Sequence, residues 1–326
     1  MRVVAYSIKS FEKELLAKAN QRKHDITLIS NSLSLETALY AEGKDAVIVF
    51  TNDDLSAPVV NKLADLGIKY IATRSVGTDH IDLQAAEKRN ILVSNIPRYS
   101  PEAIAEFAVT LALALSRKLI PTVDQSRKFD FSIDQHLGFN FHGKTVGIIG
   151  LGSIGKATAT IFKGLGCHVL GYDTAPLTKN SFIKSASLDE LLKESDIISL
   201  HIPLTADSHY FINEASIAKM KKGVMLINTS RGGLINTEDA LKALNIGRIG
   251  YLGIDVYENE KGLFLSDHHL DQAKDSLLNR LMQHPNVIVT PHQAFLTIEA
   301  LHEIAMRTIQ NLDEWQKSSA ADKACA

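Results

Sequence analysis

Short runs of apolar residues alternate with longer polar stretches through the first hundred residues. The runs that predict strands are residues 3–7, 26–29, 46–50, 70–73 and 91–94. Each run is too short for a helix, and the stretches between them have room for crossover helices, so the alternation predicts a parallel sheet. The first turn, Ser7-Ile8-Lys9-Ser10, lacks the glycines of a phosphate-binding loop. We therefore expect that this part of the chain does not bind a nucleotide.

A longer apolar segment follows at residue 101. Ser100-Pro101-Glu102 offers an N-cap, a proline at the first helical position and an acid in the first turn. Apolar residues then recur at helical spacing at Ile104, Phe107, Ala108, Leu111 and Leu115. The pattern predicts a long, largely buried helix.

From residue 145 the alternation of strands and helices resumes. The predicted strands are residues 145–149, 168–172, 196–200, 224–228, 249–254 and 287–290. Six strands suit a doubly wound sheet, whose ligands gather at the carboxyl ends of the strands. A final helix opened by Thr297 has an apolar stripe made of Ile298, Leu301, Ala305, Thr308, Leu312 and Trp315. This stripe needs a surface to cover, and we expect the helix to return to the N-terminal sheet.

The first strand of this second series ends in the glycine motif Gly150-Leu151-Gly152-Ser153-Ile154-Gly155, which opens a helix. Gly150 permits the tight turn, Gly152 lets the backbone approach a pyrophosphate, and Gly155 lets the helix pack against its strand. The phosphates would then face a helix N-terminus. A glycine-rich turn without a ligand is the alternative, but the strand and helix around the motif favour dinucleotide binding.

An acidic residue closes the next predicted strand. Asp173 lies 18 residues (173 − 155) beyond the last glycine of the motif. A carboxylate at this place accepts hydrogen bonds from the ribose hydroxyls and repels a 2′-phosphate. Asp173 therefore favours NAD over NADP.

These patterns predict an α/β protein with two doubly wound parallel-sheet domains. We expect a flavodoxin-like substrate domain, formed by residues 1–99 and 297–326, into which a Rossmann NAD-binding domain of residues 100–296 is inserted. The length of 326 residues supports two domains, because single cores rarely grow beyond roughly 200 residues. The discontinuous arrangement predicts an active-site cleft between the domains.

Composition points to a small molecule as the partner. Charged residues make up 22% of the chain and the formal net charge is −2, so there is no global basic field for nucleic acid or acidic lipid. No apolar run approaches the roughly 18 residues of a membrane span. Cys167 and Cys325 cannot build a disulfide framework, and the N-terminus enters a strand directly. We expect a cytoplasmic protein.

Charged residues follow three of the later strands. Arg231 stands beside two glycines after residues 224–228, where its fork could grip a carboxylate; a surface salt bridge is the alternative. His292 follows residues 287–290, although any one of 12 histidines is more often structural. An acidic loop with Glu258 and Glu260 follows residues 249–254, and spacing alone does not choose between them. The three strand ends together predict a carboxylate anchor, an acid/base and an orienting acid.

Several of these segments resemble a known family. The glycine motif, Asp173 and residues 201–205, 227–232, 255–258 and 291–292 resemble the D-specific 2-hydroxyacid dehydrogenases over nearly the whole chain. Residues 95–101, 258–264 and 291–295 look like the fermentative D-lactate dehydrogenase branch of that family. Two departures are mild: Leu265 stands where a second phenylalanine is common, and Ser208 stands where an asparagine is expected.

The resemblance implies roles for individual residues. Arg231 would be the partner of the substrate carboxylate and carbonyl, His292 the proton donor, and Glu260 the acid that orients and charges it. The backbone amides of Val76 and Gly77 would hold the substrate carboxylate. Tyr99 and Phe295 would shape the pocket, although both could equally be ordinary core aromatics. Beyond the glycines and Asp173, the cofactor would be lined by Ser153, Ile154, Ile202, Pro203, Ser208, Thr229, Ser230 and Asp255.

The reaction that the resemblance implies is the NADH-dependent reduction of a 2-oxo acid, with no metal. A small pocket would select pyruvate and D-lactate, whereas a roomier one would take branched acids, as in the hydroxyisocaproate enzymes. Glu260 argues against formate dehydrogenase, which has glutamine beside its histidine. An NAD-sensing corepressor is the alternative from another class of protein. As partners we expect a small 2-oxo or 2-hydroxy acid and further copies of the chain, in a dimer or tetramer.

Overall fold

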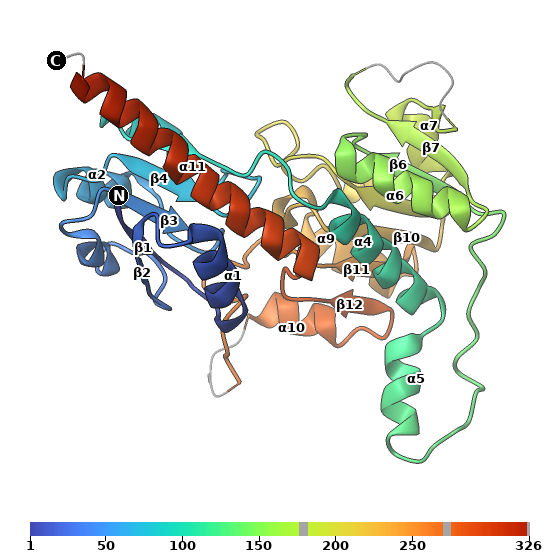
Figure 1. Cartoon of the computed structure of the whole chain (residues 1–326). Coiled ribbons are helices and arrows are strands. Elements are labelled where there is room, and N and C mark those ends of the chain that lie inside the picture. Colours follow the sequence, from blue (N-terminus) through green and yellow to red (C-terminus); the bar gives the residue numbers. More distant parts are fainter. Residues whose placement is uncertain (176–181, 270–274, 325–326) are drawn as a thin grey trace. The chain divides into compact units, whose positions relative to one another are not determined.

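The computed structural model describes residues 1–175, 182–269 and 275–324, and the chain divides into two compact units (Figure 1). Unit 1 consists of Met1–Ser100 and Leu296–Ala326, and unit 2 of Pro101–Phe295. Each unit has a parallel, open sheet flanked by helices, which confirms the predicted α/β class with two parallel sheets. Among the described helices, none combines the length and apolar character needed to cross a bilayer.

The sheet of unit 1 has five strands in the order β2-β1-β3-β4-β5. The strands are β1 (Arg2–Ala5), β2 (Asp25–Leu28), β3 (Ala46–Val49), β4 (Tyr70–Thr73) and β5 (Leu92–Ser94), all paired in parallel. The connecting helices are α1 (Ser10–Asn20), a 3-10 turn (Thr37–Ala41), α2 (Ala57–Asp65) and α3 (Leu83–Lys88). The predicted strands all exist, with ends that differ by one or two residues.

Alternate side chains of the first strand enter two different cores. Val3 and Ala5 pack with α1 and with α11 (Ile298–Ala324). Val4 and Tyr6 pack on the other face, against α2 and α3. Both faces are therefore buried, as expected for a parallel sheet with crossover helices.

The final helix packs on unit 1, because Ala305, Ile309 and Leu312 belong to the core that contains Val3. The predicted apolar stripe was wrong at its first position, since Ile298 is 79% exposed. Ile298 is the first residue of α11, and the buried stripe begins only at Ala300.

In the described part of unit 2 the sheet has seven parallel strands, in the order β12-β11-β10-β9-β6-β7-β8. They are β6 (Thr145–Ile149), β7 (His168–Tyr172), β8 (Lys184–Ser185), β9 (Ile197–Leu200), β10 (Val224–Asn228), β11 (Ile249–Ile254) and β12 (Val287–Val289). The sequence predicted six of these strands and missed β8. The missed strand has only two residues, both exposed, at the sheet edge, so no apolar run marks it.

Helices cover both faces of this second sheet. α4 (Pro101–Ser116) and α6 (Ser153–Gly164) share one core with the strands, and α4 is largely buried, as predicted. The other core includes residues of α7 (Leu188–Glu194), α8 (Glu214–Lys219) and α9 (Thr237–Asn245), with α10 (Ser276–Met282) beside β12. α5 (Leu119–Ser126) has no buried residue and extends, with the chain that follows it, away from the sheet of its unit (Figure 1).

Candidate active site

The turn after β6 is shaped by glycines that other residues could not replace. Gly150 has a φ of +93°, and a Cβ there would lie 2.3 Å from the carbonyl oxygen of His201. A Cβ on Gly155 would lie 1.9 Å from the carbonyl oxygen of Gly150. These two contacts are closer than any real Cβ contact, so the turn requires both glycines.

The middle glycine of the motif faces open space. A Cβ on Gly152 would meet no atom within 4 Å, and its φ of −66° suits any residue. Gly152 is the N-cap of α6, and Ser153 and Ile154 open that helix. The first N–H groups of a helix lack intrahelical partners and attract anions. The open space beside them therefore fits a pyrophosphate, as the sequence predicts.

Asp173 directly follows β7 and reaches back to the glycine turn. Its Oδ2 accepts a hydrogen bond from the Leu151 N–H at 2.6 Å, and its Oδ1 accepts one from the Ala175 N–H at 2.9 Å. These donors, that of Ala175 foremost, hold the pKa of the Asp173 carboxyl below its usual range. The group is therefore a fixed anion beside the turn, which suits ribose hydroxyls and disfavours a further phosphate.

Two loops at the ends of β9 and β10 contain the next predicted cofactor residues. Ile202 and Pro203 follow β9, and the Ser208 hydroxyl donates to the Pro203 carbonyl at 2.7 Å, so it closes its own loop. Ser230 likewise donates to the Leu200 carbonyl at 2.8 Å. The hydroxyl of Thr229, in contrast, is buried and has no hydrogen-bond partner among the described residues. Because such groups are rarely left unpaired, Thr229 fits a residue that meets a ligand.

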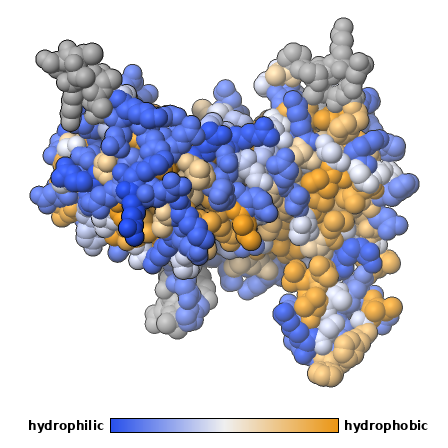
Figure 2. Space-filling view, in the orientation of Figure 1, coloured by the Kyte–Doolittle hydropathy of each residue, from blue (hydrophilic) through white to orange (hydrophobic). Residues whose placement is uncertain are grey.

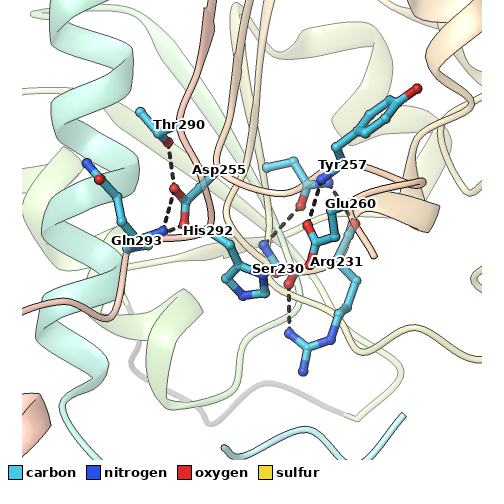
Figure 3. Close-up of polar contacts among 10 residues, drawn as sticks. Ser230, Arg231, Asp255, Tyr257, Glu260, Thr290, His292 and Gln293 are labelled. Atoms are coloured by element: carbon cyan, nitrogen blue, oxygen red, sulfur yellow. Dashed lines mark hydrogen bonds and ion pairs between the residues drawn. The ribbon is translucent and has the colours of Figure 1, made fainter. Parts of the chain in front are cut away.

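Arg231 lies in a turn that is closed by Asn228, the last residue of β10. The buried Asn228 side chain donates to the Arg231 carbonyl at 2.8 Å and accepts from the Ser230 N–H at 3.0 Å. The Arg231 guanidinium donates through Nη1 to the Ser230 carbonyl at 2.8 Å (Figure 3). Sequence reasoning missed Asn228. Its signal is a polar residue at the end of an otherwise apolar strand.

The structure brings Glu260 and His292 together. His292 Nδ1 lies 2.7 Å from Glu260 Oε1, and Glu260 Oε2 accepts from the Tyr257 N–H at 2.9 Å (Figure 3). The carboxylate is therefore oriented toward the imidazole, and it holds the ring so that Nε2 remains for a substrate. Glu258 points elsewhere, since it accepts from the Tyr210 hydroxyl and the Thr237 N–H.

The loop that contains His292 is held by a buried carboxylate. Asp255 accepts from the Thr290 hydroxyl at 2.6 Å and from the N–H groups of Gln293 at 2.9 Å and Ala294 at 2.7 Å (Figure 3). Burial raises the pKa of this carboxyl. His292 itself has a φ of +55°, a left-handed conformation that costs about 1–3 kcal/mol unless its surroundings enforce it. Asp255 thus fixes the loop, and its predicted contact with a cofactor stays a prediction.

The predicted carboxylate-binding turn lies in unit 1, after β4. The carbonyls of Ser75, Val76 and Gly77 accept hydrogen bonds from Ile96 N, Asn95 Nδ2 and Ser75 Oγ, at 2.9, 2.7 and 2.7 Å. In a trans peptide the next N–H points the opposite way from each carbonyl. The N–H groups of Val76, Gly77 and Thr78 therefore point away from these partners, and no hydrogen bond within the described residues uses them. That these N–H groups hold the substrate carboxylate stays a prediction.

The remaining pocket residues stay predictions. Tyr99 lies near the end of the first segment of unit 1, and Phe295 is the last residue of unit 2. The site residues thus belong to two units, and the predicted cleft between the domains also stays a prediction. Within the part of the chain that the structure describes, no group of histidine, cysteine and acidic residues is placed to hold a metal ion.

All the unit 2 residues of the site follow strands of one parallel sheet. Taken along the sheet, the strand ends present His292 (β12), Asp255 and Glu260 (β11), Arg231 (β10), Ile202 (β9), the glycine turn (β6) and Asp173 (β7). Because parallel strands end at the same edge, these groups form one continuous row. The arrangement can hold a dinucleotide at one end of the row and perform acid/base chemistry at the other.

Comparison with known proteins shows that the sequence of unit 2 matches one family. The sequence pattern of the NAD-binding domain of D-isomer specific 2-hydroxyacid dehydrogenases matches residues 109–294. A D-lactate dehydrogenase from Curvularia clavata is 45% identical over 323 residues, which cover 97% of this chain and 93% of the relative.

Solved structures agree with the match in sequence. A pyruvate reductase from Chlamydomonas reinhardtii has a TM-score of 0.91 at 42% identity, covering 97% of this chain and 96% of that one. A D-lactate dehydrogenase from Aquifex aeolicus, complexed with NAD and lactic acid, has a TM-score of 0.86 at 33% identity, covering 98% and 96%.

Proposed function

This chain belongs to the D-isomer specific 2-hydroxyacid dehydrogenases, which are NAD-dependent oxidoreductases, and we propose that its own reaction is the reduction of pyruvate to D-lactate and the reverse. The observation that carries the proposal is the Glu260–His292 pair at 2.7 Å, on the same sheet edge as Arg231 and the glycine turn. An acid/base pair, a carboxylate anchor and a dinucleotide turn are the parts that this reaction needs.

The chemistry follows from the orientation of each group. Arg231 would pair its planar fork with the substrate carboxylate and polarise the ketone, together with the N–H groups of the turn at Val76 and Gly77. His292, with Nδ1 held by Glu260, would donate the proton on Nε2 to the oxygen that becomes the hydroxyl. NADH supplies the hydride to C2 of the 2-oxo acid when it is bound. The reverse reaction needs neutral His292, which then accepts the hydroxyl proton.

A substrate panel tests the proposal. The purified protein is assayed for NADH oxidation with pyruvate, 2-oxobutyrate, 2-oxoisocaproate, phenylpyruvate and hydroxypyruvate. We expect the highest kcat/KM with pyruvate and a product of D configuration. A maximum with 2-oxoisocaproate would replace D-lactate by a branched hydroxy acid within the same family. NADH binding without turnover of any acid would favour the corepressor alternative.

We also propose that the protein assembles with copies of itself through α5 and the segment after it. This arm, residues 117–137, exposes Leu119, Ile120, Val123, Phe129, Phe131, Ile133 and Leu137. Phe129 is 87% exposed and Leu137 85%, and Figure 2 shows hydrophobic surface over this part of unit 2. Soluble monomers rarely expose so many neighbouring apolar side chains. The arm also contains both lysine and aspartate side chains, so two copies can match each other's charges.

Sedimentation measures the assembly directly. The wild type should sediment as a dimer or tetramer, and the pair of substitutions Phe131→Asp and Ile133→Asp should produce a monomer that still folds. A wild type that is monomeric at micromolar concentration would reject the assembly. The cytoplasmic location predicted from the sequence stays a prediction.

A further inference from the structure

A buried ion pair lies at the base of the turn that contains Val76 and Gly77. Arg74 directly follows β4 and is only 2% exposed. Its Nη1 is hydrogen-bonded to Glu12 Oε1, and the Glu12 side chain is 11% exposed. Buried ion pairs contribute little net stability compared with apolar residues of the same size. The presence of this pair therefore calls for a role other than stability.

The guanidinium joins the carboxyl ends of three neighbouring strands. Its Nη2 donates to the Tyr6 carbonyl, just after β1, at 2.7 Å. The backbone N–H of Arg74 donates to the Val49 carbonyl, at the end of β3, at 3.0 Å. The charged group also lies over the Phe50 ring, 5.1 Å from its centroid. Arg74 thus ties the end of β4 to β1 and β3 at the edge where the turn begins.

The partner of Arg74 is itself fixed. Glu12 lies in the first turn of α1, and its Oε2 accepts from the Lys9 N–H at 2.9 Å. One carboxylate oxygen therefore holds the start of α1 while the other holds the guanidinium. Neither group can rotate without leaving a buried charge unpaired, which costs several kcal/mol.

The chain beyond Arg74 has few degrees of freedom left. Ser75, Val76 and Gly77 have their carbonyls held by Ile96 N, Asn95 Nδ2 and Ser75 Oγ, as described above. Those bonds set the direction of the N–H groups relative to β5, and Arg74 sets the position of the whole turn relative to β1 and β3. We propose that Arg74, paired with Glu12, is a positioning residue that places the N–H groups of this turn for the substrate carboxylate.

This inference rests on the proposed function and makes a prediction of its own. Arg74 does not touch substrate, so its loss should weaken the binding of the 2-oxo acid and leave the binding of NADH unchanged. NADH would bind to unit 2, whose fold includes neither Arg74 nor Glu12. A merely structural role would instead lower the stability of unit 1 without a selective effect on the acid.

Two variants and one control separate these outcomes. Arg74→Met removes the guanidinium but leaves Glu12 unpaired, and the double variant Arg74→Met with Glu12→Gln removes both charges, which protects folding. The control is Asp313→Asn, which breaks a partly buried ionic cluster of unit 1: Asp313 binds His24 at 3.0 Å and Lys23 at 2.8 Å. His24 precedes β2, so this pair lies at the opposite edge of the parallel sheet from Arg74.

The measurements are KM for pyruvate, inhibition by oxamate, NADH affinity by fluorescence and Tm. In the double variant we expect KM and the oxamate inhibition constant to rise about tenfold, with NADH affinity within twofold of wild type. Arg74→Lys, which can keep the bond to Glu12, should restore part of the loss. Asp313→Asn should lower Tm and leave KM unchanged.

Three results would overturn the inference: a double variant with KM within twofold of wild type, an equal loss of NADH affinity, or an equal rise of KM in Asp313→Asn. The wild type separates this inference from the proposed function. A wild type that reduces no 2-oxo acid rejects both, whereas an active wild type with an unaffected double variant rejects only the role of Arg74.

Discussion

The first strand of each sheet leads into a helix through a turn, and the two turns differ in what lies beside them. In unit 1, after β1, Ser7 has a φ of +56° and its hydroxyl donates to the buried carboxylate of Asp53 at 2.7 Å. The same carboxylate accepts from the N–H groups of Leu33 and Phe50, at 2.7 and 2.6 Å. In unit 2, after β6, Gly150 has a φ of +93° and the space over Gly152 is open.

The comparison shows two uses of the same architecture. At the strand ends of unit 1 the Asp53 carboxylate accepts from the Ser7 hydroxyl and from the N–H groups of Leu33 and Phe50, so the space beside the turn after β1 is filled by the protein itself. In unit 2 the Leu151 N–H donates to Asp173, but the space over Gly152 at the start of α6 is open, so a ligand can supply an anion there. We call the surroundings of Asp53 the filled region and the strand ends of unit 2 the open region. Substitutions in the filled region should lower stability, and substitutions in the open region should lower activity. Arg74 is the proposed exception, because it lies in unit 1 and is expected to affect substrate binding.

The largest expected effect is in the open region, at Arg231. Lysine keeps the charge but loses the planar fork, so Arg231→Lys should lower kcat/KM for pyruvate about a hundredfold, which corresponds to about 3 kcal/mol. NADH affinity and Tm should change little. Steady-state kinetics and thermal unfolding measure both. A variant that retains wild-type kcat/KM would show that another group anchors the carboxylate.

The matching change in the filled region is Asp53→Asn. In the native protein both carboxylate oxygens accept hydrogen bonds from backbone N–H groups. An asparagine would place its NH2 group against one of these donors and leave that hydrogen bond unmade, so the free energy of unfolding should fall by about 1–3 kcal/mol. Denaturant unfolding measures the loss. The kcat/KM for pyruvate in the folded fraction should stay within about twofold of wild type, and a selective loss of activity would break the proposed contrast.

Removal of the charge beside His292 should have an intermediate effect. Glu260→Gln keeps the shape but not the charge that stabilises the protonated imidazole, so kcat for pyruvate reduction should fall on the order of tenfold. Glu258→Gln is the matched control, since Glu258 binds Tyr210 and Thr237. Equal losses in the two variants would remove Glu260 from its role.

A single methyl group tests the open space directly. Gly152→Ala adds a Cβ that meets no protein atom, so Tm should be nearly unchanged. The same Cβ would occupy the space expected for the pyrophosphate, and NADH affinity should fall at least about tenfold, or about 1.4 kcal/mol. Fluorescence titration measures the affinity. Unchanged affinity would mean that the dinucleotide does not pass over this residue.

The smallest expected effect concerns the choice between cofactors. Asp173 is an anion at the end of β7, so NADH should be preferred over NADPH by at least about tenfold in kcat/KM. Asp173→Ala should narrow this preference, chiefly by weakening NADH. Kinetics with both cofactors provide the measurement. Equal use of the two cofactors by the wild type would remove Asp173 from this role.

Most of the fold and part of the site could be predicted from the sequence, for physical reasons. Largely apolar strands such as β9 and β10 are buried at every position, so their apolar character marks them plainly. β8 has two exposed residues and leaves no such mark. In the site, the sequence gives the residue type at each strand end, as with Arg231 and Asp173. It does not give the path of a loop, which is what turns Glu260 toward His292 and Glu258 toward Tyr210.

Contacts between residues far apart in the sequence could not be predicted from local sequence patterns. Arg74 and Glu12 are 62 residues apart, and neither stands in a motif. Asp255 could be predicted to lie at a strand end, but its three bonds to the His292 loop depend on how β11 and β12 pair. Local periodicity contains no information about such pairings.

The passage of the chain through two units has a consequence for the order in which they can fold during synthesis. Pro101–Phe295 is a continuous segment, so unit 2 can complete its core before α11 is synthesised. One face of the first sheet, with Val3 and Ala5, is covered by Ala305, Ile309 and Leu312 of α11. Those residues are synthesised at least 300 positions (305 − 5) after the strand that they cover. The face of the first sheet that contains Val3 and Ala5 therefore cannot be covered until α11 has been synthesised. Until then the nascent chain exposes an apolar face that a chaperone could bind.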